Sequence, residues 1–181
     1  MKATGIVRRI DELGRIVIPK EIRRTFNIRE GTPLEIFCGE NNELVLKKYS
    51  MINELKDFAT DVCQATFDTL ACPVIICDKD SFVAYSGVQK NLFLDKTISQ
   101  KLFRHIDNRK DILKNKQDGD LMIELFDGDT TDYSSQIVVP IMSSGDTYGA
   151  IICYKTSQNK LSQTELQVLK VMSNFLAEQI G

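Results

Sequence analysis

The sequence has little of the chemistry that most enzymes use. His105 is the only histidine in 181 residues, so no histidine cluster can bind a metal, and no partner for it as a general base is evident. No glycine-rich phosphate loop is present, and the aspartates of residues 118–132 lack the spacing of a calcium-binding loop. We therefore expect a protein that is not an enzyme and needs no metal or cofactor, with a solvated acidic loop at residues 127–132.

Disulfides and membrane segments are equally poorly supported. The cysteines are five in number, lie in apolar stretches and include no C-x-x-C pair, which favours buried, reduced thiols over zinc ligands or disulfides; they are Cys38, Cys63, Cys72, Cys77 and Cys153. No apolar run approaches the roughly 20 residues of a membrane span. The N-terminus carries Lys2 but no apolar signal segment. These features predict a cytoplasmic protein with no membrane contact.

The charge is distributed unevenly along the chain, although the net charge is only −2. Residues 1–50 hold ten Lys and Arg against seven Asp and Glu, whereas residues 51–181 hold thirteen against eighteen. A basic module followed by an acidic one is expected if only the first binds a polyanion. We therefore predict two domains, 1–50 and 51–181.

Arginine is concentrated in the basic module. Arginine keeps its charge at neutral pH, and its planar fork matches phosphate oxygens and guanine edges. The alternative is a basic face that only water covers. The clustered arginines are Arg8, Arg9, Arg15, Arg23 and Arg24.

Alternation and turn residues predict a small β-rich unit over residues 1–50. Two strands at 4–11 and 14–18 flank a turn at Gly14, and a helix begins at Pro19. A second hairpin joins residues 34–38 to 44–46, with one apolar face. Because so small a domain is short of core and has no disulfide or metal, we expect a second chain to complete it.

Residues 51–181 predict an α+β domain with an antiparallel sheet covered by helices. Apolar residues recur at helical spacing over 52–70, and strands are expected at 73–78, 82–87, 121–126, 136–142 and 147–154. Residues 97–116 look helical, and Ser162 with Glu165 forms a capping box that starts a last helix. The first and last helices of this region carry apolar stripes broad enough to pack on a second subunit as well as on the sheet.

The segment from Lys2 to Lys48 resembles the AbrB family of swapped-hairpin DNA-binding domains. The resemblance rests on the turn D-E-L-G-R, the helix start I-P-K-E-I-R-R and the strand R-E-G-T-P-L-E-I. It implies that two chains exchange hairpins to form one β-barrel that binds double-stranded DNA, in A·T-rich promoter regions. By resemblance, the DNA-contacting positions are Arg8, Arg15, Arg23 and Arg24, to which we add the neighbours Lys2, Arg9 and Lys20.

The rest of the chain resembles a GAF-type domain, through P-V-I-I-C-D and P-I-M-S-S-G-D-T-Y-G-A-I-I-C-Y. An AbrB-type head followed by one GAF-type domain is similar to a family of transcription regulators of spore-forming bacteria. That resemblance implies activation and repression of sporulation genes, a nucleoid-associated protein of the forespore, and a homotetramer of two swapped homodimers joined through the C-terminal domains.

Two alternatives stay open. AbrB-like barrels also occur in antitoxins, which would make the N-terminal domain a protein-binding module. The GAF-type domain either senses a small-molecule effector or serves dimerisation alone, and the cyclic-nucleotide pattern N-K-x-x-F…D-E is missing. The aromatic residues Phe82, Tyr85, Phe93 and Tyr133 are candidates for a pocket lining, although such residues more often belong to a core.

Overall fold

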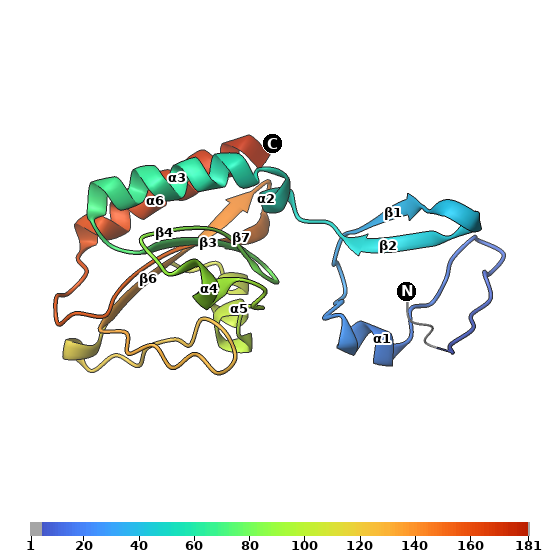
Figure 1. Cartoon of the computed structure of the whole chain (residues 1–181), viewed down its shortest axis with the longest axis horizontal. Coiled ribbons are helices and arrows are strands. Elements are labelled where there is room, and N and C mark those ends of the chain that lie inside the picture. The colour runs from blue at the N-terminus through green and yellow to red at the C-terminus, as the bar shows by residue number, and fades with distance from the viewer. Residues whose placement is uncertain (1–4, 181) are drawn as a thin grey trace. The chain divides into compact units, whose positions relative to one another are not determined.

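The computed structural model of the chain describes residues 5–180 (Figure 1). Its contacts divide the chain into two compact units, Met1–Tyr49 and Ser50–Gly181. Tyr49 is followed directly by the Ser50 N-cap of the first helix of the second unit.

The N-terminal unit contains one short helix and one hairpin. Helix α1 (Lys20–Thr25) starts directly after Pro19, as predicted. Strands β1 (Leu34–Cys38) and β2 (Leu44–Lys48) pair antiparallel around the 3-10 turn η1 (Glu40–Asn42), with Ile36 opposite Leu46. The predicted second hairpin is therefore confirmed.

The first predicted hairpin does not form a ladder within one chain. Over the described residues 5–18 no strand is present, and the regular feature is the turn at residues 12–14. In that turn Gly14 has φ +75° and its N–H donates to the Asp11 carbonyl at 2.9 Å, which confirms the predicted role of this glycine. A strand needs hydrogen-bond partners for its backbone groups. Beyond the bond from the Asp11 N–H to the Arg15 carbonyl at 3.1 Å, no ladder joins the described residues before the turn to those after it.

The apolar residues of the N-terminal unit face solvent. None of the described side chains between Gly5 and Tyr49 is buried. Strands β1 and β2 were expected to bury one apolar face. On that face the side chains of Ile36 and Leu44 are 65% and 66% exposed. A single copy of this unit therefore lacks an interior.

The C-terminal unit is a five-stranded antiparallel sheet with helices on both faces, which confirms the α+β class. Its strands follow the order β4-β3-β7-β6-β5. The strands are β3 (Val74–Asp78), β4 (Phe82–Ser86), β5 (Ile112–Asn115), β6 (Ser135–Ser143) and β7 (Asp146–Lys155). The helices are α2 (Met51–Glu54), α3 (Lys56–Leu70), α4 (Lys90–Phe93), α5 (Gln100–Asp107), the 3-10 turn η2 (Lys116–Asp118) and α6 (Gln163–Ile180).

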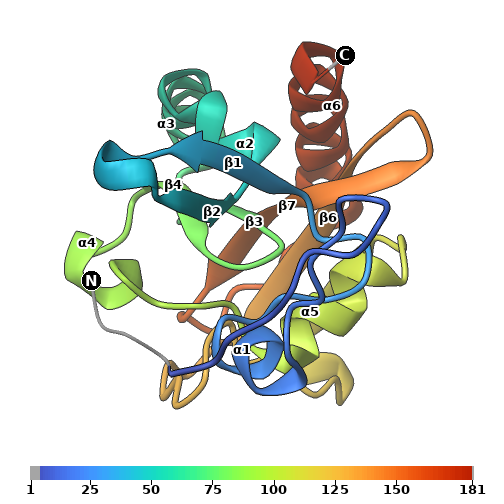
Figure 2. The same ribbon diagram turned by 90° about the vertical axis from the view of Figure 1, so that its right-hand side faces the viewer.

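Two apolar cores lie on the two faces of this sheet. Helices α3 and α6 cover one face and α5 covers the other, as Figures 1 and 2 show. Every residue of β3 is buried. Alternate side chains of the strand point to opposite faces of the sheet, and each face carries one of the two cores. Ile76 belongs to the core under α3 and α6, and its neighbour Ile75 to the core under α5.

Two predicted elements are wrong. The helix expected over residues 97–116 is limited to α5, because Arg109 takes φ +58° and the chain then enters the edge strand β5. The strand expected at 121–126 is an extended loop. The side-chain amide of Gln136 binds both the N–H and the carbonyl of Ile123 at 2.7 Å, and thereby replaces a ladder with one buried side chain.

The capping box at the start of α6 forms in part. The Ser162 N–H donates to Glu165 Oε2 at 2.9 Å, as predicted, while Ser162 Oγ accepts from the Thr164 N–H at 3.2 Å rather than from that of Glu165. Among residues 5–180, no helix has both the length and the apolar character required to cross a bilayer.

Gly149 on β7 is the tightest backbone approach in the C-terminal unit. A Cβ there would lie 1.9 Å from the Cys77 carbonyl oxygen and 2.7 Å from Ile52 Cδ1.

We expect Gly149→Ala to destabilise this unit by about 3 kcal/mol or more, because backbone cannot move aside as a side-chain tip can. Urea unfolding of the full chain measures this. Gly145→Ala is the control, because a Cβ at Gly145 would meet no atom within 4 Å and only the positive φ would strain the new side chain. This substitution should lower the free energy of unfolding by about 1 kcal/mol. Equal losses would contradict the steric account.

Candidate nucleic-acid interface

The turn between the two arms of residues 5–18 is organised by Asp11. Its Oδ1 accepts the N–H groups of Leu13 at 3.0 Å and Arg15 at 2.8 Å, and its Oδ2 accepts the Arg15 Nε–H at 2.7 Å. An aspartate at the first position of a turn commonly binds the backbone two residues on. Here the same carboxylate also holds the guanidinium of a predicted DNA-contacting residue.

The pKa of the Asp11 carboxyl lies below its ordinary value. The main cause is the backbone hydrogen bond from Arg15, followed by that from the Arg15 side chain. The carboxylate is therefore charged near neutral pH, and it orients Arg15 while offsetting part of its charge. The Arg15 side chain remains 71% exposed, so its remaining N–H donors are available to a phosphate or a base.

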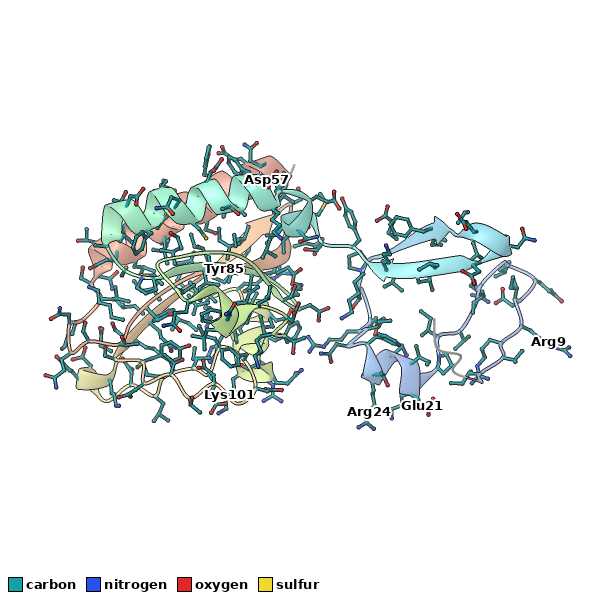
Figure 3. The ribbon with its side chains drawn as sticks, viewed as in Figure 1. Arg9, Glu21, Arg24, Asp57, Tyr85 and Lys101 are labelled. Carbon is teal, nitrogen blue, oxygen red and sulfur yellow. The ribbon has the colours of Figure 1, made fainter. Side chains whose placement is uncertain are left out.

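Arg8 and Arg9 lie on the first arm, and both are exposed. The Arg8 Nη1 donates to the Val7 carbonyl at 3.1 Å, which is a weak local tether. Arg9 projects away from the ribbon (Figure 3). These two residues and Arg15 thus place three guanidinium groups on one loop of the unit.

Three more of the predicted cations, Lys20, Arg23 and Arg24, lie on α1. Arg23 and Arg24 occupy the last turn of this helix, and both are exposed. Lys20 and Arg24 are one turn apart and line a shallow hollow together with Glu21 and Thr25. Figure 3 shows Arg24 and Glu21 on α1, apart from Arg9 on the loop. Cations in the last turn of a helix also suit the negative end of its dipole.

Two acidic residues of this surface, Asp11 and Glu21, were not predicted as part of the site from the sequence. Asp11 was interpreted only as part of a turn motif, although an aspartate four residues before an arginine in a tight turn is a signal for such a pair. Glu21 lies within the hollow beside Arg24, where a carboxylate opposes a phosphate. Lys2, the remaining predicted contact, lies outside the described residues.

The aromatic residues considered for an effector pocket pack on one another in the core under α5. Phe93 is buried and meets Phe82 and Phe126 edge to face, with centroids 5.0 and 5.7 Å apart. Tyr133 is buried against Tyr154 and donates its hydroxyl to Asp129 Oδ2 at 2.6 Å. Phe82, Phe93 and Tyr133 were candidates for the lining of an effector pocket. In the structure they belong to the apolar core under α5 or pack against it.

Comparison with known proteins gives matches over both units. Residues 54–181 match the family described as stage V sporulation protein T C-terminal, transcription factor, and residues 7–53 match antidote-toxin recognition MazE, bacterial antitoxin. The chain is 46% identical over 180 residues to stage V sporulation protein T of Bacillus subtilis strain 168, covering 99% of each chain. Its N-terminal part is 57% identical over 49 residues to transition state regulatory protein AbrB of the same strain, covering 27% of this chain and 50% of that protein.

Solved structures match the C-terminal unit in fold. The GAF domain from the Acinetobacter phosphoenolpyruvate-protein phosphotransferase covers 74% of this chain and 84% of its own, with a TM-score of 0.59 and 14% identity. The type II free methionine-R-sulfoxide reductase from Thermoplasma acidophilum covers 70% and 94%, with a TM-score of 0.55 and 15% identity. At these identities the likeness shows a shared GAF-like fold alone.

The matches agree with the architecture seen in the structure, a small arginine-rich unit followed by a GAF-like α+β domain. The family match covers more than half of the chain, and the full-length relative covers nearly all of it. The chain therefore belongs to the stage V sporulation protein T family of transcription factors, with a MazE/AbrB-type N-terminal domain and a GAF-like C-terminal domain.

Proposed function

We propose that this protein regulates sporulation genes by binding double-stranded DNA through a dimer of its N-terminal unit. The observation that carries the proposal is the surface of that unit, where Arg8, Arg9, Arg15, Arg23 and Arg24 are all exposed. The relationship to a sporulation transcription factor and to AbrB supports the same function. We infer no enzymatic activity, in line with the family's role in transcription.

The apolar surface of the N-terminal unit supports the proposed dimer. In the described part of this unit, eleven large apolar side chains are exposed: Ile6, Val7, Ile10, Leu13, Ile16, Val17, Phe26, Ile36, Phe37, Leu44 and Leu46. At about 25 cal/mol per Å² of apolar surface, leaving these residues in water would forfeit most of the driving force for folding. Exchange of the 5–18 arms with a second chain would supply both a ladder and an interior, as the swapped-hairpin barrel requires. The dimer then doubles each arginine about a two-fold axis.

A further contact through α3 and α6 would join two such dimers. The rings of Phe58 on α3 and Phe175 on α6 pack at a tilt of 53° with centroids 5.1 Å apart. Phe175 and Val171 remain exposed one turn apart on α6. This surplus apolar surface lies on the helical layer, outside the core that packs on the sheet. We propose a homotetramer, in which two DNA-binding units act with higher avidity than one.

The alternative function is a protein-binding antitoxin module, which the MazE-type match over residues 7–53 favours. Antitoxins usually bind their toxin with a disordered C-terminal tail. Here residues 50–181 form a compact unit with two buried cores, which favours the regulator. Co-purification of a toxin with the full chain would favour the antitoxin instead.

Salt dependence of DNA affinity tests the proposed function. Four arginines from each of two chains neutralise up to about eight phosphates, which predicts a log–log slope down to about −7 for an A·T-rich promoter duplex. Combining Arg23→Ala with Arg24→Ala removes four of these charges per dimer. The slope should become shallower by about 3 to 4, with at least a tenfold loss of affinity at low salt.

Arg104→Ala, at an exposed position of α5, is the matched control and should change neither value. Binding that is flat in salt, or equal for promoter and scrambled duplex, would contradict a sequence-biased DNA-binding dimer.

Asp11 should act as a positioning residue for the turn that carries Arg15. Asp11→Asn keeps an oxygen for the two backbone N–H groups and removes a negative charge from the interface, so DNA affinity should hold or rise. Both variants lose the acceptor of the Arg15 Nε–H, but Asp11→Ala also removes the acceptor of the two backbone N–H groups. Its affinity should therefore fall about five- to tenfold below that of Asp11→Asn, because the turn that carries Arg15 loses its fixed geometry. Titration of both variants at one salt concentration measures the difference. Equal affinities would mean that Asp11 acts by charge alone.

The two proposed contacts between chains predict separable changes in mass. Ile16→Asp places a charge in the exchanged hairpin and should halve the native mass of the full chain, because the α3–α6 contact remains. Phe175→Asp should also halve it while leaving the hairpin dimer able to bind DNA. Light scattering after size exclusion measures the masses. Leu121→Asp, at an exposed loop position, is the control. An unchanged tetramer in either variant would contradict the contact assigned to that residue.

A further inference from the structure

Two cysteines that are far apart in the sequence meet in the core of the C-terminal unit. The Sγ atoms of Cys72 and Cys153 lie 2.6 Å apart although 81 positions separate the residues. Cys72 follows the end of α3 and precedes β3, and Cys153 lies on β7 opposite Val74 of β3. The antiparallel pairing of β3 with β7 therefore fixes the approach of the two thiols.

The other cysteines of the chain differ from this pair. Cys63 is buried on α3, and burial raises the pKa of its thiol to about 12. Cys77 is buried on β3, where burial also raises its pKa. Cys38 is exposed on β1 in the N-terminal unit. The chain thus contains natural controls, two buried thiols whose protonated state is favoured and one exposed thiol.

The surroundings of the pair make its two members unequal. The hydrogen bond with the Cys153 thiol lowers the pKa of Cys72; burial opposes this, and the nearby Lys155 ammonium lowers the pKa further. The same hydrogen bond and burial raise the pKa of Cys153. Lys155 is half-buried and pairs with Glu165 at 3.5 Å, and Glu165 acts on both thiols in the opposite sense. Since the thiolate is the nucleophile, this asymmetry favours Cys72 over Cys153 as the attacking member.

Both members of the pair are buried, and Cys72 is the one beside an exposed segment. Cys72 itself is buried, but the preceding residue, Ala71, is exposed and ends α3 in a left-handed conformation. A local opening of the turn between α3 and β3 would expose the Cys72 sulfur, whereas Cys77 lies within a strand that is buried along its whole length.

We propose that Cys72 and Cys153 form a dithiol site that a hydroperoxide oxidises to an intramolecular disulfide. The Cys72 thiolate attacks the O–O bond of the peroxide, gains the terminal oxygen as a sulfenic acid and releases water or an alcohol. The Cys153 sulfur then attacks the sulfenic sulfur and displaces its oxygen as water. Two thiols lose two electrons and two protons in total, and one hydroperoxide is reduced.

The disulfide would join the turn between α3 and β3 to strand β7. The sulfurs need to move by only about half an ångström to reach the S–S distance of about 2.05 Å. A bridge across 81 positions constrains the unfolded chain, so the oxidised protein should unfold at a higher temperature than the reduced one. The site does not depend on the DNA-binding surface, and the inference is independent of the proposed function.

The experiment treats the full chain carrying Cys38→Ser with hydrogen peroxide and counts free thiols under denaturing conditions. Removal of Cys38 excludes disulfides between molecules through the exposed thiol. We expect the thiol count to fall from four to two with loss of two hydrogens by mass spectrometry, and recovery of four thiols after dithiothreitol. Trypsin should release one linked pair of peptides, residues 57–79 and 117–155.

Four variants in the same background identify the partners. Adding Cys63→Ser or Cys77→Ser should still allow the loss of two thiols, whereas adding Cys72→Ser or Cys153→Ser should abolish the internal disulfide. A cooperative thermal unfolding transition of each reduced variant tests whether the variant is folded. If Cys153→Ser does not fold, Cys153→Ala replaces it. The chain with Cys38 intact controls for the oxidant, because its exposed thiol should react.

Retention of all four thiols under conditions that oxidise Cys38 would overturn the proposal. So would a disulfide that survives in the Cys72→Ser or Cys153→Ser variant, or oxygen gain at these cysteines without loss of a thiol pair.

Discussion

The N-terminal unit has to place a large apolar surface on a frame that has no interior of its own. Its hairpin β1–β2 and helix α1 form within one chain, yet Ile36 and Leu44 face solvent and no described side chain of the unit is buried. Local hydrogen bonds are sufficient to shape such short elements but not to stabilise them. The proposed exchange of hairpins is the response to this constraint, and the two-fold display of arginines is its consequence.

The arginines are organised by a second constraint, the need to hold long cationic side chains without neutralising them. Asp11 meets it at the turn, where a single carboxylate fixes two backbone N–H groups and the Arg15 Nε–H. On α1, Arg23 and Arg24 lie in the last turn of a short helix, and no carboxylate among residues 5–180 holds them in this way. The turn is thus the better preorganised part of the proposed interface, while α1 offers exposed charges suited to phosphates.

The C-terminal unit solves the problem of burial by itself. Its sheet is covered on both faces, and its aromatic residues pack edge to face under α5 instead of lining an open site. The covering helices α3 and α6 retain apolar residues such as Phe175 on their outer side. The same helical layer therefore serves the core within one chain and the proposed contact between chains.

The sequence by itself determined the elements whose signals are local. The turn at Gly14, the start of α1 after Pro19 and the hairpin β3–β4 follow from residue conformations and spacing, and the family follows from its motifs. Residues 97–116 and 121–126 were assigned wrongly, because a left-handed Arg109 and the side chain of Gln136 decide them through contacts that spacing does not reveal. Only the tertiary structure brought Cys72 to Cys153. That pair depends on the register between β3 and β7, two strands distant in the sequence, and residue spacing does not reveal it. The contact of Asp11 with Arg15 is local, and the structure adds to its spacing only the path of the turn.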